Sequence, residues 1–187
     1  MALVAGLGNP GSQYAGTRHN IGFELIDRLS SELSIPVRRT ADTRLYEMGQ
    51  GQFKGEQVIL MKPLTFMNRS GSALKHALNH FKLPLHRCMV CYDDIHLSPG
   101  TLRIRSKGSA GGHNGLADVL TAIQSEQIPR MRIGIGNDFA AGRQSDYVLS
   151  SFTSDQQKLI DEALTSAVDA IITFIREGIE QTMNKFN

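Results

Sequence analysis

The sequence has few cysteines and no long apolar run. Two cysteines in 187 residues exclude a disulfide framework. The most apolar stretch, residues 163–179, contains Asp169, Arg176 and Glu177, whereas a membrane-spanning helix needs about 20 predominantly apolar residues. Met1 leads directly into a short apolar segment with no basic region, so no signal peptide is expected. These absences predict a cytosolic protein that does not cross a membrane.

The net charge is also small. Twenty Lys and Arg residues against 18 Asp and Glu residues give +2, which is too little to indicate a polyanionic partner. The charge is uneven, however. Residues 1–143 carry 17 basic and 11 acidic side chains, and residues 144–187 carry 3 and 7. Nucleic-acid binding therefore requires a local basic cluster, and the acidic C-terminal segment is a poor candidate for it.

The sequence contains no internal repeat and no low-complexity segment, which indicates one domain over residues 1–187. Apolar spacing predicts strands that alternate with helices. The glycine-rich residues 49–55 are interpreted as a hairpin-like connection. The predicted strands are 3–7, 45–48, 57–61, 88–92, 101–105 and 131–135, and the predicted helices are 21–33, 74–81, 116–123 and a long C-terminal helix, about 154–183. This order predicts an α/β fold with a mixed sheet.

The cysteines form the pair Cys88-Met89-Val90-Cys91, whose spacing also suits a redox or metal site. The surrounding residues 87–92 are predominantly apolar and indicate a buried strand. Residues three apart on a strand point to opposite faces and lie about 10 Å apart, beyond disulfide or chelate reach. We therefore expect two reduced thiols in the core.

Residues 6–11, Gly-Leu-Gly-Asn-Pro-Gly, match the glycine pattern of dinucleotide-binding proteins. That function requires a helix to begin inside the motif, so that its first N–H groups meet the pyrophosphate. Here Asn9-Pro10-Gly11 is typical of a turn, and helical spacing begins only near Asn20. A nicotinamide or flavin site is therefore not expected.

Basic residues alternate along one predicted strand. Arg103, Arg105 and Lys107 have a period of two, so they share one face. Arg130 and Arg132 alternate in the same way on a later strand. These side chains form either a solvated sheet face or a patch that faces phosphates.

Polar residues also follow the predicted strands, at positions where α/β proteins place active sites. Four loops could bring them to one cleft. Each has a structural alternative: Asn68 and Asn114 could cap helices, Asp93 could cap a turn, and His19 could be structural. The candidates are Asn9, Tyr14, His19, Asn20, Phe66, Asn68, Asp93, Asp94, His113 and Asn114.

Five sequence blocks in order resemble the bacterial peptidyl-tRNA hydrolases. The first begins Val4-Ala5-Gly6-Leu7-Gly8-Asn9-Pro10-Gly11 and continues through Tyr14 to Thr17-Arg18-His19-Asn20-Ile21-Gly22. The others are residues 62–71, 93–94, 107–115 and 132–136. Together the blocks span residues 4–136, and the chain length is also similar.

The resemblance implies a monomeric cytosolic enzyme without metal or cofactor, built on a twisted mixed sheet flanked by helices. Its reaction would be hydrolysis of the ester that joins a peptide to tRNA, which recycles tRNA from aborted translation. By motif, His19 would be the general base, Asp93 its orienting carboxylate, and Asn9 would help to distinguish blocked from free amino groups. The matching substrate contacts are Tyr14, Phe66, Asn68 and Asn114, and the residues expected near the tRNA acceptor end are Arg103, Arg105 and Arg132.

The residue types suit this chemistry independently. An ester has a good leaving group, so water needs only a base that titrates near neutral pH, which histidine provides. A carboxylate on the other ring nitrogen fixes the tautomer and stabilises the imidazolium. Asparagine can donate to the oxyanion, although the sequence leaves open which asparagine does so. With neither a serine elbow nor a covalent cysteine indicated, direct attack by water is favoured.

One position departs from the family pattern. Where the family usually has aspartate, this chain has His96, in the segment Asp93-Asp94-Ile95-His96. His96 would either alter the local potential and pH dependence or be a neutral surface change. The main rival hypothesis is an RNA-binding relative without hydrolysis, and the retention of both His19 and Asp93 argues against it.

Overall fold

A single mixed β-sheet organises the molecule. In the computed structural model, which describes residues 1–41 and 43–187, seven strands pair in the order β2-β3-β4-β1-β5-β7-β6. The four central strands are parallel, and both edges are antiparallel. The strands are β1 (Ala2–Gly6), β2 (Arg38–Thr40), β3 (Thr43–Phe53), β4 (Glu56–Pro63), β5 (Cys88–Asp94), β6 (Leu102–Arg105) and β7 (Arg130–Gly134).

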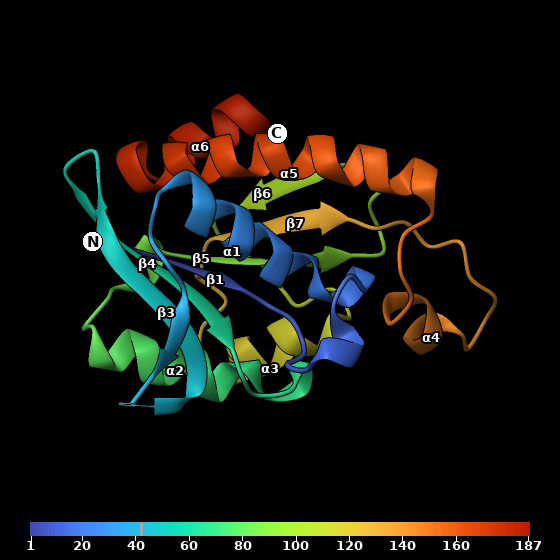
Figure 1. Ribbon diagram of the computed structural model, residues 1–187, viewed down its shortest axis with the longest axis horizontal. Helices are drawn as coiled ribbons and strands as arrows, with labels where there is room; N and C mark the ends of the chain where they lie inside the picture. Colours follow the sequence, from blue (N-terminus) through green and yellow to red (C-terminus); the bar gives the residue numbers. More distant parts are fainter. Residues whose placement is uncertain (42) are drawn as a thin grey trace.

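Helices cover both faces of this sheet (Figure 1). Helices α1, α5 and α6 pack on one face, and α2 and α3 pack on the other. The short helix α4 stands beyond the carboxyl ends of the parallel strands. The α-helices are α1 (Ile21–Glu32), α2 (Ser70–His80), α3 (Asn114–Ile123), α4 (Gln144–Val148), α5 (Ser154–Glu177) and α6 (Ile179–Phe186), and the 3₁₀ turns are η1 (Ser12–Tyr14), η2 (Arg18–Asn20), η3 (Met67–Arg69) and η4 (Leu85–Arg87).

This architecture confirms the predicted single-domain α/β fold with a mixed sheet. Strand β5 is buried at every position, and its alternate side chains enter different helical layers. Cys88 lies in the α2–α3 layer and Cys91 in the α1–α5 layer, and both are free thiols. Burial raises the pKa of both thiols. In the described residues, no helix combines the length and hydropathy needed to cross a membrane.

The prediction that residues 49–55 form a connection is wrong for most of that segment. Strand β3 continues to Phe53, and only the following two residues make the turn. Gly49 lies within this strand, and a larger residue would not fit there because a Cβ atom would be 2.6 Å from the carbonyl oxygen of Pro36. The glycine therefore indicates close packing of the 35–36 segment rather than a turn. The short edge strand β2 was not predicted.

The predicted C-terminal helix is divided in two. Its start is confirmed, because Thr153 and Gln156 form a capping box. Its predicted continuation to about residue 183 is wrong, because Gly178, with φ of 83°, ends α5 and allows α6 to turn back. The side chain of Asn187 then bonds to both the backbone N–H and the carbonyl of Ile104, which covers the edge strand β6.

Close backbone packing places the start of α1 against the end of β5. A Cβ atom on Gly22 would lie 2.4 Å from the carbonyl oxygen of Leu7 and 2.7 Å from that of Cys91. A Cβ atom on Gly6 would lie 2.1 Å from the carbonyl oxygen of Gly22. These glycines let η2 and α1 reach the carboxyl edge of the central strands.

We expect Gly22→Ala to destabilise the fold by about 3 kcal/mol, because the new methyl group would meet main-chain atoms that cannot move aside. Helix propensity alone predicts the opposite, a gain of about 1 kcal/mol. Urea unfolding measures the difference. Ser31→Ala, at an exposed site of the same helix, is the control and should change stability by less than about 0.5 kcal/mol. Equal stability of both variants would contradict this packing argument.

Candidate active site

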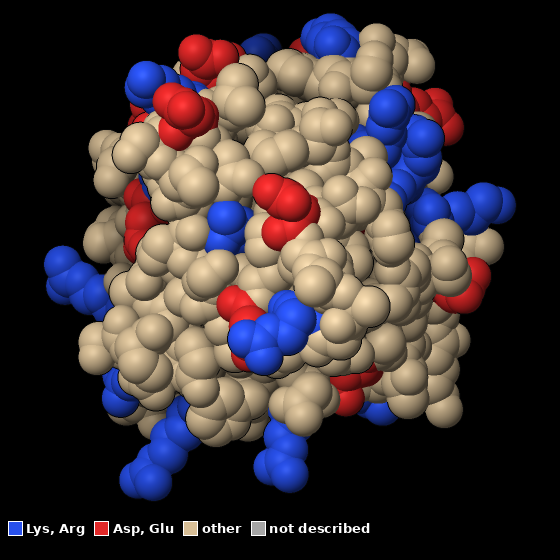
Figure 2. All heavy atoms as spheres, turned by 90° about the vertical axis from the view of Figure 1, so that its right-hand side faces the viewer, with Lys and Arg blue, Asp and Glu red and all other residues tan. Residues whose placement is uncertain are grey.

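The carboxyl ends of the central strands open into a cavity of about 640 Å³. Figure 2 views the molecule from this side, where uncharged side chains cover most of the centre. The cavity lies between the strand ends, the loop before α3 and the helix α4. Its lining residues are Asn9, His19, Asp93, Asp94, Ile95, His96, Gly111, Gly112, His113, Asn114, Gln144, Ser145, Val148 and Leu149.

The centre of this cavity is a histidine–carboxylate pair. His19 lies in η2, directly before α1, and Asp93 lies near the end of β5. The Nδ1 atom of His19 is 2.9 Å from each carboxylate oxygen of Asp93. The Asp93 side chain is only 2% exposed, whereas that of His19 is 15% exposed. Two residues that are 74 positions apart in the chain therefore meet, as the family resemblance implied.

A second imidazole completes the hydrogen bonds of Asp93. His113 Nε2 lies 3.0 Å from Asp93 Oδ1, and His113 Nδ1 accepts a hydrogen bond from the backbone N–H of Leu116. His113 is therefore the N-cap of α3, and Asn114, which the sequence offered as a cap, is the first helical residue. Histidine is not among the favoured capping residues, so no sequence pattern indicated this role.

The hydrogen bonds assign the protons of both rings. Because His113 Nδ1 accepts from Leu116, its proton is on Nε2, which donates to Asp93. Asp93 as an acceptor likewise places a proton on His19 Nδ1, so the lone pair is on His19 Nε2. Burial opposes ionisation of Asp93, but His113 and His19 outweigh it and hold the pKa of Asp93 well below its usual range.

The same three side chains have the spacing of a metal site. One ligand atom from each of His19, Asp93 and His113 lies within 4.8 Å of the others. However, the nitrogen that His113 directs to Asp93 carries a proton, so it has no lone pair for a metal ion. The hydrogen-bonded arrangement favours proton transfer over metal ligation.

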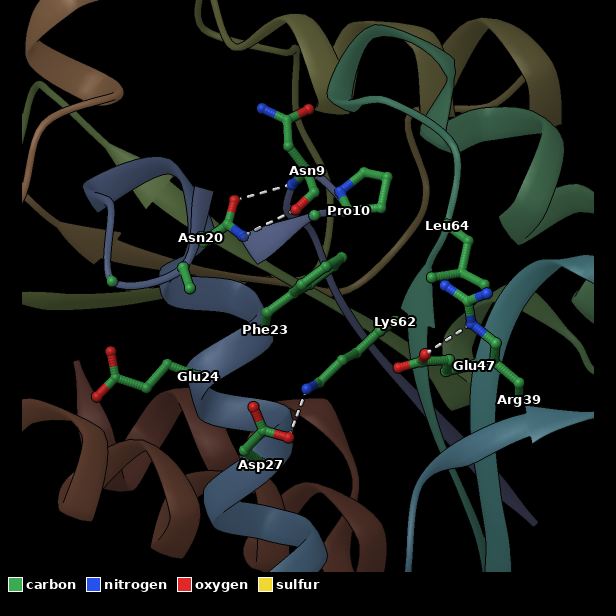
Figure 3. Close-up of a pocket in the computed structure, with 13 residues that line it drawn as sticks. Asn9, Pro10, Asn20, Phe23, Glu24, Asp27, Arg39, Glu47, Lys62 and Leu64 are labelled. Atoms are coloured by element: carbon green, nitrogen blue, oxygen red, sulfur yellow. Dashed lines mark hydrogen bonds and ion pairs between the residues drawn. The ribbon is translucent and has the colours of Figure 1, made fainter. Parts of the chain in front are cut away.

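Asn9 forms one wall of the cavity and is fixed in direction. Its backbone N–H donates to Asn20 Oδ1 at 2.8 Å, and Asn20 Nδ2 donates to its carbonyl at 2.9 Å (Figure 3). The Oδ1 atom of Asn9 accepts from the backbone N–H of Met67. Since that oxygen is engaged, the NH₂ group is the end of the amide that remains for a ligand. Asn20, a candidate from the sequence, therefore positions Asn9.

Of the other predicted substrate contacts, one lines the cavity and three do not. Asn114 lines it and is exposed at the start of α3. The rings of Tyr14 and Phe66 meet edge to face with centroids 6.5 Å apart, and Phe66 is 54% exposed. Asn68 is exposed in η3 and is not the cap of α2, because Arg69 occupies that position. Tyr14, Phe66 and Asn68 lie outside the set of residues that lines the cavity.

A second cavity of about 440 Å³ adjoins Asn9 and Asn20 on the side of β3 and β4. Figure 3 shows its walls, where Lys62 pairs with Asp27 and Arg39 pairs with Glu47. The charges of these four side chains are thus paired with one another.

The basic strands confirm the predicted alternation but not every predicted role. Arg103 pairs with Arg132 across β6 and β7, and Arg105 pairs with Arg130, so these four lie on one sheet face. Arg105 is exposed and Arg103 is half-buried, and Arg132 forms an ion pair with Asp94. Figure 2 shows a group of Lys and Arg side chains at its right-hand margin.

Arg130 corrects the predicted phosphate-facing patch. This residue is 2% exposed, and its guanidinium donates to the carbonyl oxygens of Gly108, Ser109 and Glu126. The loop after β6 covers the arginine, so it is not available to phosphates. It instead fixes the loop that leads to His113.

His96 lies at the rim of the cavity. Its backbone N–H donates to Asp94 Oδ1 at 2.8 Å, and its Nε2 lies 3.3 Å from the carbonyl oxygen of Gly111. A carbonyl only accepts, so Nε2 is the protonated nitrogen. His96 thus joins the loop after β5 to the loop before α3.

A histidine hydrogen-bonded to a buried carboxylate, with amide groups beside it at the edge of an α/β sheet, is an arrangement typical of hydrolases. The family model described as peptidyl-tRNA hydrolase matches residues 3–187. The peptidyl-tRNA hydrolase of Caldanaerobacter subterraneus subsp. tengcongensis is 50% identical, and the match covers 100% of both chains. That of Salinibacter ruber is 46% identical over 99% of this chain and 97% of its own.

A solved structure gives the same result. The crystal structure of peptidyl-tRNA hydrolase from Acinetobacter baumannii matches with a TM-score of 0.94 at 34% identity, and covers 100% of this chain and 94% of that chain. The chain therefore belongs to the peptidyl-tRNA hydrolase family, and it is a hydrolase.

The low pKa of Asp93 predicts a pH-dependent contribution to stability. Its ionised form is favoured by folding, so the contribution is present above the unfolded pKa of about 4 and is lost as the pH falls toward the lower folded pKa. Asp93→Asn should therefore lower Tm at pH 7, with a difference from wild type that shrinks below about pH 4. Asp138→Asn makes the same change at an exposed site and is the control. A Tm difference for Asp93→Asn that is constant from pH 7 to pH 3 would contradict the assignment.

Proposed function

We propose that this chain hydrolyses the ester bond of peptidyl-tRNA by means of water that His19 activates. Family membership supports the reaction and the substrate. The observation that carries the mechanism is the bond from His19 Nδ1 to buried Asp93, which leaves the lone pair on Nε2. That nitrogen is the base that the reaction requires.

In the first step, His19 Nε2 takes a proton from water as the water oxygen attacks the ester carbonyl. Asp93 stabilises the imidazolium that forms, because its negative charge lies 2.9 Å from Nδ1. In the second step the tetrahedral intermediate collapses, and the imidazolium returns the proton to the departing ribose oxygen. The products are free tRNA and a peptide with a C-terminal carboxylate.

His113 has a supporting part in this mechanism. Its Nε2–H bond to Asp93 favours the ionised carboxylate and fixes the carboxylate plane. Asn9 and Asn114 are two of the amide side chains that line the cavity with His19, and each is suited to donate to the developing oxyanion. For Asn9, the engaged Oδ1 leaves the NH₂ group for this bond.

The remaining contacts divide between peptide and tRNA. Half-buried Tyr14 and exposed Phe66 form an aromatic pair, and Asn68 presents an exposed amide, which together suit the peptide portion of the substrate. On the β6–β7 side of the cavity, the basic residues suited to phosphates are Arg103, Arg105 and Arg132.

The chain is further proposed to act in the cytoplasm, as one domain over residues 1–187 and as a monomer. A tRNA substrate and two free buried thiols support a cytoplasmic site.

His19→Ala should reduce hydrolysis of N-acetyl-aminoacyl-tRNA by about 10²-fold to 10⁴-fold, the usual range for loss of a general base. Single-turnover kinetics with saturating enzyme measure this step. His86→Ala is the matched control, because His86 is exposed in η4 before the opposite end of β5. Full activity of His19→Ala would remove His19 from the mechanism. Binding of tRNA without hydrolysis by the wild type would favour the RNA-binding alternative.

Arg105→Ala should weaken binding of tRNA substrates and reduce the slope of log K against log salt by about 1, because one phosphate contact is lost. Hydrolysis of a short ester analogue without tRNA should be unchanged. Arg38→Ala, on the exposed strand β2 at the other edge of the sheet, is the control. Equal losses on both substrates would indicate damage to the fold and would contradict a role in tRNA binding.

A further inference from the structure

Arg18, the residue before His19, is a buried cation whose partners are neutral. It is 4% exposed, and its Nη1 atom donates to the carbonyl of Ser150 at 3.1 Å, the hydroxyl of Ser150 at 2.6 Å and the carbonyl of Ser151 at 2.6 Å. Its Nη2 atom donates to Gln156 Oε1 at 2.7 Å. Every acceptor that Arg18 reaches in the described part of the chain is thus uncharged.

Aromatic rings enclose the same guanidinium. Its carbon lies 4.2 Å from the centroid of the Tyr147 ring and 5.1 Å from that of Phe152. The Nε atom of Arg18 has no hydrogen-bond partner among the described residues. Burial of a charge without a counter-ion is costly, so a side chain that served only to fill this space would more favourably be apolar. This cost indicates that the directed bonds of the guanidinium serve a purpose.

All of these hydrogen bonds end on the junction between α4 and α5, residues 147–156. Tyr147 belongs to the last turn of α4, and Gln156 to the first turn of α5, where its Oε1 also accepts from the backbone N–H of Thr153. Carbonyl groups at the end of a helix carry partial negative charge, which suits a cation. The guanidinium therefore fixes the end of α4 and the linker that follows it.

The other side of this junction is the wall of the cavity. Gln144, Ser145, Val148 and Leu149 line the cavity together with His19. The backbone of the η2 segment is also bound to the junction, because the N–H of Arg18 donates to the carbonyl of Ser150. One residue thus connects the α4 wall to the segment that carries His19.

We propose that Arg18 is a positioning residue, which sets the α4 wall relative to His19 so that the wall binds the substrate beside the scissile ester. The inference rests on the proposed function for its kinetic consequence only. Arg18 itself does not touch the reacting atoms, and the His19–Asp93 bonds do not include it. Its loss should therefore weaken substrate binding more than it slows proton transfer.

The test uses Arg18→Ala with two readouts. Amide hydrogen exchange of residues 144–150 in the free protein should increase, while exchange in β1 and β5 stays at the wild-type rate. KM for N-acetyl-aminoacyl-tRNA should rise by about 10-fold or more, with a smaller change in kcat and an unchanged acid limb of the kcat profile. Guanidinium ion at millimolar concentration should lower KM again, and methylammonium should not, because only the former has the planar set of donors.

Arg28→Ala is the matched control. Arg28 is also an arginine near α5, but it pairs with Glu24 and Asp161 at the surface, so its loss should leave both readouts unchanged. If Arg18→Ala fails to fold, Ser150→Ala/Gln156→Met carries the same test, because it removes two acceptors and leaves the charge in place. This double variant should raise KM and exchange in the same segment by smaller factors.

Wild-type exchange in residues 144–150 of Arg18→Ala would overturn the inference, and this readout does not depend on hydrolysis. A shift of the acid limb of kcat with unchanged KM would also overturn it, since Arg18 would then act on the proton transfer of His19. If the wild-type protein fails to cleave peptidyl-tRNA but Arg18→Ala still increases exchange in residues 144–150, the result would contradict the proposed function and leave the structural role of Arg18 intact.

Discussion

The site depends on one buried carboxylate. Asp93 lies near the end of a strand that is buried at every position, where an ionised group is stable only if hydrogen bonds replace its water. Two imidazole N–H groups provide those bonds, one from the turn before α1 and one from the loop before α3. The requirement of a single side chain therefore fixes the relative positions of three segments that are distant in the sequence.

The two histidines around Asp93 differ in function because of their other nitrogen. His113 uses Nδ1 to accept the Leu116 N–H that caps α3, so both of its ring nitrogens are engaged in structural bonds. His19 makes its bond to Asp93 with Nδ1 and keeps Nε2 for a proton. The same residue type beside the same carboxylate is thus a fixed donor in one case and, in the proposed mechanism, a base in the other. The difference depends on whether a backbone N–H group engages the second ring nitrogen, as that of Leu116 does for His113.

Much of this arrangement follows from sequence patterns. Alternation along residues 88–92 predicted two cysteines in separate layers, and polar residues after several strands predicted a cleft at their ends. The pairing of His19 with Asp93 came from the family resemblance, because spacing alone does not connect residues in different loops. The role of His113 had no pattern to indicate it, since it depends on a cap of an unusual type and on a partner from another strand.

Two other prediction errors arose because a sequence pattern does not show which segment packs against a residue. A period of two correctly placed Arg130 on the face shared with Arg132, but the pattern does not state what covers that face. Gly49 was interpreted as part of a connection, but the position of Pro36 shows that this glycine permits a close contact within a strand. The end of α5 at Gly178 is different, because it was predictable from the sequence: a helix commonly ends where glycine takes a positive φ.

Two buried arginines solve the same problem on opposite walls of the cavity. The loop before α3 and the linker after α4 are irregular, so their carbonyl groups lack the partners that a helix or sheet would supply. Arg130 donates to the carbonyls of Gly108 and Ser109, and Arg18 donates to those of Ser150 and Ser151. Arginine suits both places because one planar group carries five donors. Both walls are therefore attached to the sheet and to the start of α1 by side chains, which gives irregular segments a defined position around Asp93.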